Sequence, residues 1–130
     1  MFTIPRRWFI ALAPAALARA AEVTRPAVSE QACPLQPFPG VEGFLRKPPG
    51  PGPFPAVLYI HGGLVTRPLD TLRDLALNQA NPSRYLAAGY VLGVITYRSR
   101  DHDPQSTVSL EDCLAAVRSL KQLAFVDPRS

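Results

Sequence analysis

The stretch AVLYIHGG, residues 56–63, sets an apolar run directly against a histidine and two glycines. An apolar run without alternation is typical of a strand buried on both faces, as in the middle of a mostly parallel sheet. A second run of this kind, YVLGVITY at residues 90–97, follows further along the chain. Hydrophobic residues make up 47% of the chain and charged residues 18%, which favours a globular domain over a disordered one. These features predict an α/β domain.

The segments around the two runs complete the predicted order of elements. A short strand is expected at residues 44–47, and the Pro-rich turn at 48–53 would bring it antiparallel to the 56–60 strand. Helical spacing of apolar residues predicts a helix around 70–77 and another across 81–89. Since strands and amphipathic helices alternate, we expect a layered α/β sheet.

Particular residues predict where two of the helices begin and end. Asn81 can cap the first turn, Pro82 suits the first helical position, and Gly89 can take the left-handed position after the last turn. Ser109 is expected to open the final helix, with Asp112 in the capping-box position. That helix carries one apolar stripe, made of Leu110, Cys113, Leu114, Val117, Leu120 and Ala124.

The N-terminus has the features of an export signal. Arg6 and Arg7 precede an apolar run that ends in a small-residue cleavage pattern, so residues 1–21 are predicted to be a signal peptide and 22–43 an N-terminal arm. The stretch RRWFI resembles the bacterial twin-arginine signal, and the general secretory route remains an alternative, as does a buried first helix. We therefore expect an exported protein, periplasmic or extracellular, without a stable membrane anchor after cleavage.

Charge and cysteine content narrow the classes of partner. Removing residues 1–20 takes away three arginines and no acidic residue, which lowers the formal net charge from +4 to +1. A nucleic-acid partner is not expected, because no basic patch with interleaved aromatic residues remains.

Cys33 and Cys113 could pair in an oxidising compartment or stay as free thiols, and neither has metal-type spacing.

Three blocks in succession carry a family resemblance: PFPAVLYIHGG at 53–63, AAGYVLGVITYR at 87–98, and SLEDCLAAVRSLKQLAFVDPRS at 109–130. Their order resembles the α/β-hydrolase superfamily, in particular the dienelactone-hydrolase and prolyl-oligopeptidase catalytic domains. The resemblance covers residues 44–130. It implies the N-terminal part of a hydrolase sheet, in which a short antiparallel strand is followed by mostly parallel strands with flanking helices.

The resemblance also implies roles for the residues that end the first apolar run. Gly62, Gly63 and the backbone N–H of Leu64 would form the oxyanion hole, and Tyr59 and His61 would support that loop. In this family the nucleophile precedes the acid and the histidine, so a histidine this early is not the triad base. For catalysis itself, the favoured interpretation is that Tyr59 is ordinary core and His61 an ordinary structural histidine.

The nucleophile itself is not in the sequence. No Gly-x-Ser-x-Gly elbow occurs in the 130 residues, and the family pattern places it just after Ser130. We expect the N-terminal portion of a secreted serine hydrolase, acting on a small-molecule ester or a peptide and inactive alone, with no cofactor or metal. The alternative is an exported non-catalytic binding module built on the same sheet.

Other polar groups are weaker candidates. Asp101, His102 and Asp103 could be metal ligands, but neighbouring residues rarely converge on one ion, so a polar loop is the simpler interpretation. Arg98 could reach a cleft or form a structural ion pair. The serines at 99, 106 and 109 lack an elbow and a matched base, so none is a credible nucleophile.

Overall fold

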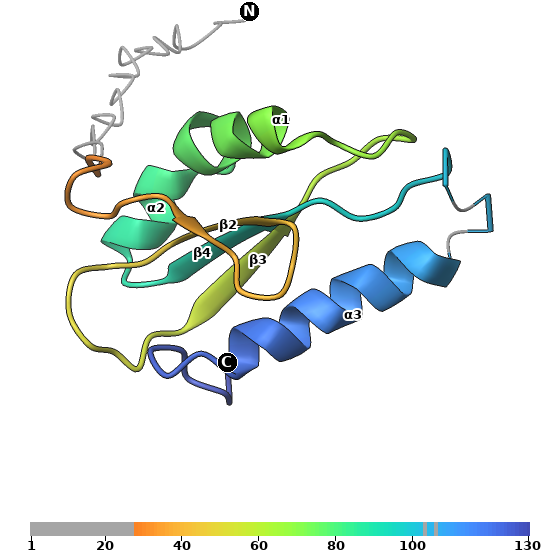
Figure 1. Ribbon diagram of the computed structural model, residues 1–130. Helices are drawn as coiled ribbons and strands as arrows, with labels where there is room; N and C mark the ends of the chain where they lie inside the picture. Colours follow the sequence, from red (N-terminus) through yellow and green to blue (C-terminus); the bar gives the residue numbers. More distant parts are fainter. Residues whose placement is uncertain (1–27, 103, 106) are drawn as a thin grey trace, which may run out of the picture.

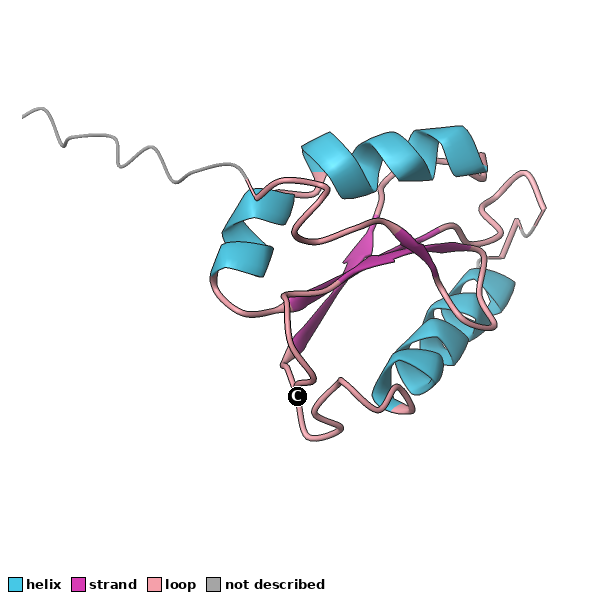
Figure 2. Cartoon of the chain, turned by 60° about the vertical axis from the view of Figure 1, so that its left-hand side comes forward, coloured by secondary structure: helices cyan, strands magenta, loops and turns pink. Residues whose placement is uncertain are grey.

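The computed structural model describes residues 28–102, 104–105 and 107–130. The predicted signal peptide and the first residues of the predicted arm lie outside this range. A four-stranded mixed sheet, in the order β1-β2-β4-β3, forms the centre, and helices cover both of its faces (Figures 1 and 2). The α/β class expected from the sequence is therefore correct. The elements are β1 (Gln36–Pro37), β2 (Gly43–Arg46), β3 (Ala56–Ile60), α1 (Leu69–Asp74), the π-helical turn η1 (Leu75–Gln79), α2 (Pro82–Ala87), β4 (Val91–Ile95) and α3 (Thr107–Lys121).

Strand β4 lies between β2 and β3. It pairs antiparallel with β2 and parallel with β3, whose last residue Ile60 lies opposite Ile95. Strand β2 therefore runs antiparallel to β3, as expected, but the two strands do not pair with each other because β4 lies between them. The Pro-rich connection crosses to the end of α3, where the N–H of Phe54 donates to the Phe125 carbonyl and the N–H of Asp127 donates to the Phe54 carbonyl.

The two apolar strands differ in burial. Every residue of β4 is buried, as the unbroken apolar pattern predicts. Strand β3 has the same pattern, but it is only half-buried and Ile60 is 49% exposed. The prediction of burial on both faces fails for β3 because it is the edge strand of the described sheet.

Two apolar cores lie on opposite faces of the sheet, because successive strand side chains point to opposite sides. One core packs beneath α3 and includes Leu45, Val91, Ile95, Ala116 and Leu120. The other packs beneath α1 and η1 and includes Leu72, Ala76, Leu92 and Val94. The sheet is therefore held from both faces, and its strand ends are fixed in position.

The helix ends match the sequence in part. Gly89 has φ +84° after α2 and Pro82 begins that helix, as expected, but Asn81 is itself left-handed (φ 50°) and its side chain caps nothing. The expected capping box is also wrong. Helix α3 begins at Thr107, and Ser109 and Asp112 both bond Arg98 instead.

The cysteines are both free and lie on opposite faces of the sheet. Cys33 is buried, and its carbonyl accepts a hydrogen bond from Arg46, which contacts η1 on that face. Cys113 packs against the core beneath α3. Burial raises the pKa of its thiol, and the charge of Asp112 adds to this effect.

Among the described helices, none has both the length and the apolar character needed to cross a membrane.

Candidate functional site

Two loops meet at one edge of the sheet. Strands β3 and β4 are parallel, so their carboxyl ends lie side by side, and the segments that follow Ile60 and Ile95 leave the sheet together. In open α/β sheets ligands bind at this edge. The residues predicted to form an oxyanion hole follow β3 directly, so the fold puts them where a ligand would be expected.

The glycines that end β3 have different conformations. Gly63 has φ +123°, a backbone conformation that L side chains rarely adopt. Gly62 does not have a positive φ, and a Cβ on it would meet no atom within 4 Å. Gly62, Gly63 and Leu64 are all exposed, and their backbone N–H groups donate to no acceptor in the part of the chain that the structure describes. Three adjacent donors are thus available at the edge of the sheet.

The start of the loop is held by Tyr97. Its ring stacks on the ring of His61, with centroids 4.7 Å apart and planes 17° from parallel. The Tyr97 hydroxyl donates to the His61 carbonyl at 2.5 Å. His61 is 4% exposed, and its Nδ1 lies 3.2 Å from the Gly62 carbonyl. These contacts give His61 the position of a support for the loop, while Tyr59 packs into the core beneath α1.

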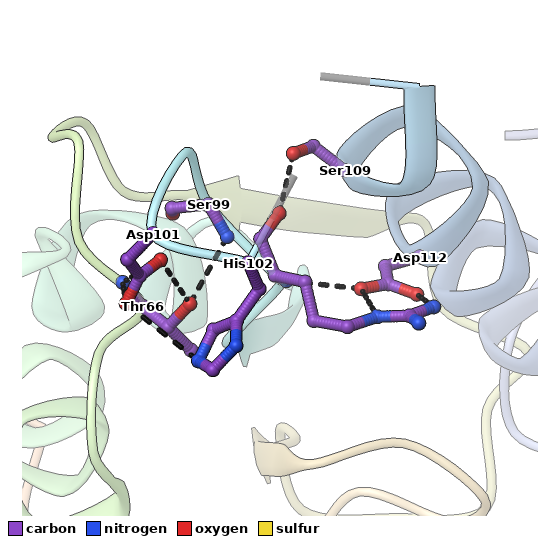
Figure 3. Close-up of polar contacts among 7 residues, drawn as sticks. Thr66, Ser99, Asp101, His102, Ser109 and Asp112 are labelled. Atoms are coloured by element: carbon purple, nitrogen blue, oxygen red, sulfur yellow. Dashed lines mark hydrogen bonds and ion pairs between the residues drawn. The ribbon is translucent and has the colours of Figure 1, made fainter. Parts of the chain in front are cut away.

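The end of the loop is held by Asp101 (Figure 3). The hydroxyl of Thr66 donates to this carboxylate at 2.9 Å, and the Thr66 N–H donates to both of its oxygens at 3.2 Å. Ser99 adds its own N–H, which donates to the Thr66 hydroxyl at 3.0 Å. Desolvation raises the pKa of Asp101, but the hydrogen bonds from Thr66 and the interaction with His102, 3.7 Å away, together outweigh it and lower the pKa overall.

A third contact fixes the segment after β4 to α3. The guanidinium of Arg98 binds both oxygens of Asp112, at 2.6 and 3.0 Å, and the Arg98 N–H donates to the same carboxylate at 2.9 Å. Ser109 donates its hydroxyl to the Arg98 carbonyl. The structural ion pair expected for Arg98 is present, and Arg98 also lines a cavity of about 300 Å³ together with Thr96 and Tyr97. Its hydrogen bonds hold the pKa of the Asp112 carboxyl below its usual range.

Unpaired buried polar atoms concentrate at this edge. Within the described ranges, the buried side-chain atoms without a hydrogen-bond partner are His61 Nε2, Thr96 Oγ1 and Ser99 Oγ. Buried polar groups are normally paired, so such atoms require an explanation, and functional sites are one place where they occur. Two cavities of about 300 and 310 Å³ flank the loop, one lined by Thr96 and Tyr97 and the other by His61 and Gly62.

The sequence did not single out Tyr97, Thr66 or Asp101 as parts of this site. The parallel register offers a signal for Tyr97, because Ile60 lies opposite Ile95 and the next residues of the two segments must therefore be neighbours. No local pattern links Thr66 with Asp101, which are 35 residues apart.

The possible metal ligands are only partly described. His102 lies 3.7 Å from Asp101, and Asp103 is outside the described residues. Among the residues that are described, no three His, Cys, Asp or Glu side chains are grouped so as to hold a metal ion. Asp101 instead binds Thr66.

Comparison with known proteins adds no assignment. No family model, curated protein or solved structure matches the chain.

Proposed function

We propose that this chain supplies the oxyanion-binding part of an exported serine hydrolase of the α/β-hydrolase type, which acts on small-molecule esters or on peptides through an acyl-enzyme. The N–H groups of Gly62, Gly63 and Leu64 are the proposed donors to the oxyanion. The nucleophile, acid and base of such an enzyme would come from sequence that follows Ser130. The enzyme would be periplasmic or extracellular.

The observation that carries the proposal is the state of these three donors. They are exposed and unpaired, and they lie between two anchored points, the Tyr97–His61 contact and the Thr66–Asp101 contact. An oxyanion hole needs donors whose positions are fixed before the reaction, because their stabilising effect then requires no reorganisation. A loop held at both ends, with free N–H groups between the anchors, meets that requirement.

The uncovered side of β3 gives independent support. Beside this strand, a cavity of about 200 Å³ is lined mainly by apolar residues, among them Ala56, Leu58 and Val117, with Lys121 and Ser130 at its border. On α3, Leu110 and Leu114 are 61% and 43% exposed, so two of the six residues of the predicted apolar stripe have no cover in the described chain. A further parallel strand beside β3 would cover both surfaces, and in the resembling family that neighbour carries the nucleophile.

The test begins with the reading frame. The proposal requires a Gly-x-Ser-x-Gly elbow soon after Ser130, whereas a stop codon there would refute the enzyme and leave the non-catalytic binding module. If the elbow is present, the protein encoded by the whole frame should hydrolyse a simple aryl ester. Gly63→Ala keeps the backbone N–H but is strained at a φ of +123°, so the backbone should shift, displace this donor and lower kcat by up to about 10²-fold, the effect of losing one oxyanion donor. Unchanged kcat in Gly63→Ala would contradict the role proposed for this loop, and Tyr90→Phe serves as the control.

A further inference from the structure

A second polar cavity adjoins the proposed oxyanion loop. It has a volume of about 310 Å³ and is lined by Tyr59, His61, Gly62, Arg67, Thr71, Leu75 and Gln79. It lies between the carboxyl end of β3 and the helical segment α1–η1, and it shares Gly62 with the loop. Its volume is at the lower end of the range for small-molecule sites, about 300–1,000 Å³.

Arg67 places a cation at the boundary between this cavity and the loop. A Cβ on Gly63 would lie 3.2 Å from its Nη2, so the guanidinium packs directly against the glycine pair. Its one hydrogen bond within the described residues is a long contact of 3.5 Å to the Gly62 carbonyl, and no described carboxylate lies within 4.0 Å of it. Most of the guanidinium donors are therefore available to a ligand.

The remaining lining residues leave this charge uncompensated. None of them is acidic. Asp74, on the same helical segment, is occupied, because its carboxylate accepts hydrogen bonds from the side-chain amides of Asn78 and Gln79. Thr71 contributes a neutral hydroxyl to the cavity. The lining therefore combines one fixed positive charge with neutral polar groups, which suits an anion.

We infer that this cavity binds an oxyanion, namely a carboxylate carried by the substrate next to its scissile carbonyl. A planar guanidinium fork matches a carboxylate with two parallel hydrogen bonds. The inference rests on the proposed function, because the shared Gly62 is what places the bound carboxylate next to the reacting group. It narrows the substrate class to anionic acyl compounds.

The inference can be tested by binding alone, on the purified chain. Glutarate and inorganic phosphate are titrated into ¹⁵N-labelled protein, with dimethyl glutarate as the uncharged analogue. Glutarate should shift the amide signals of Gly62 and Thr71 saturably, and dimethyl glutarate should not. Arg67→Gln should weaken glutarate binding by about tenfold, the effect expected for one hydrogen-bonded charge.

Arg73→Gln is the matched control. It removes the same charge from α1, but Arg73 pairs with Glu30 at 3.7 Å and does not line the cavity. Binding should stay within about twofold of the original in this variant, since surface pairs contribute little. Circular dichroism should show that both variants are folded.

Three results would overturn the inference: no saturable shift with glutarate, equal weakening in both variants, or binding of phosphate without binding of glutarate. The last would identify a site for a free inorganic anion and not for a substrate carboxylate. Glutarate binding in a protein whose complete reading frame lacks ester hydrolysis would leave the cavity as an anion site and refute only the proposed function.

Discussion

Tyr97→Phe tests whether the predicted oxyanion loop is held by the segment that follows β4. The substitution removes one hydroxyl and keeps the ring, so the stacking on His61 at 4.7 Å is retained. What is lost is the hydrogen bond to the His61 carbonyl. Since this carbonyl accepts no other hydrogen bond within the described residues, it is left unpaired at a half-buried position.

The size of the effect follows from the bond that is lost. A neutral hydrogen bond contributes about 1 kcal/mol net to the free energy of unfolding, and an unpaired buried partner raises the cost. In a domain of this size, 1 kcal/mol corresponds to a decrease of about 5 °C in Tm. The loop should also move more, so we expect the amide order parameters of Gly62 and Gly63 to fall from about 0.85 towards 0.6.

Thermal unfolding followed by circular dichroism measures the first effect, and ¹⁵N relaxation measures the second. Tyr90→Phe is the control, because Tyr90 is exposed and its hydroxyl makes no hydrogen bond in the described chain. If Tyr97→Phe has the same Tm as Tyr90→Phe and leaves the order parameters of Gly62 and Gly63 unchanged, the Tyr97–His61 hydrogen bond does not hold the loop.

Three further predictions concern backbone, charge and the buried arginine. Gly63→Ala should cost about 1–2 kcal/mol because of its φ of +123°, whereas Gly62→Ala should be nearly neutral in urea unfolding. The pKa of Asp112 is lowered by Arg98, so its stabilising effect is complete above the usual value of 3.8 and is lost as the pH falls through the lowered pKa. Asp112→Asn should reduce the fall in the free energy of unfolding at acidic pH, measured by urea unfolding at several pH values. An unchanged pH dependence would contradict the role of the Arg98–Asp112 pair. Arg46→Met should cost about 3 kcal/mol in urea unfolding, and a loss below about 1 kcal/mol would show that its carbonyl contacts contribute little.

Local sequence signals predicted the elements well. The residues of β3 were predicted without error, and β4 is the predicted strand shortened at both ends. The unbroken apolar pattern located both strands, but it predicted burial on both faces correctly only for β4, because β3 is the edge strand of the described sheet. Pro82 and Gly89 marked the ends of α2 through their own backbone preferences.

Pairing and side-chain partners could not be predicted in this way, because they depend on residues far apart in the chain. Arg46 is the clearest case, since an arginine at the end of β2 gives no sign of burial. It is 2% exposed and donates to the carbonyls of Cys33, Ala76 and Val28. The position of β4 between β2 and β3 likewise depends on the contact between Phe54 and the end of α3.

The two glycines after β3 therefore answer different requirements. Gly63 is needed for the backbone itself, because its φ of +123° excludes ordinary side chains. A Cβ on Gly62 would meet no atom within 4 Å, so glycine is not required there for steric reasons. In the proposed function, the missing side chain leaves the space above the Gly62 N–H open. Tyr97 and Asp101 hold the two ends of this segment, and both follow β4. The proposed oxyanion site is thus a property of the β3–β4 pair, and a change in the segment after β4 should disturb it as much as a change in the glycines.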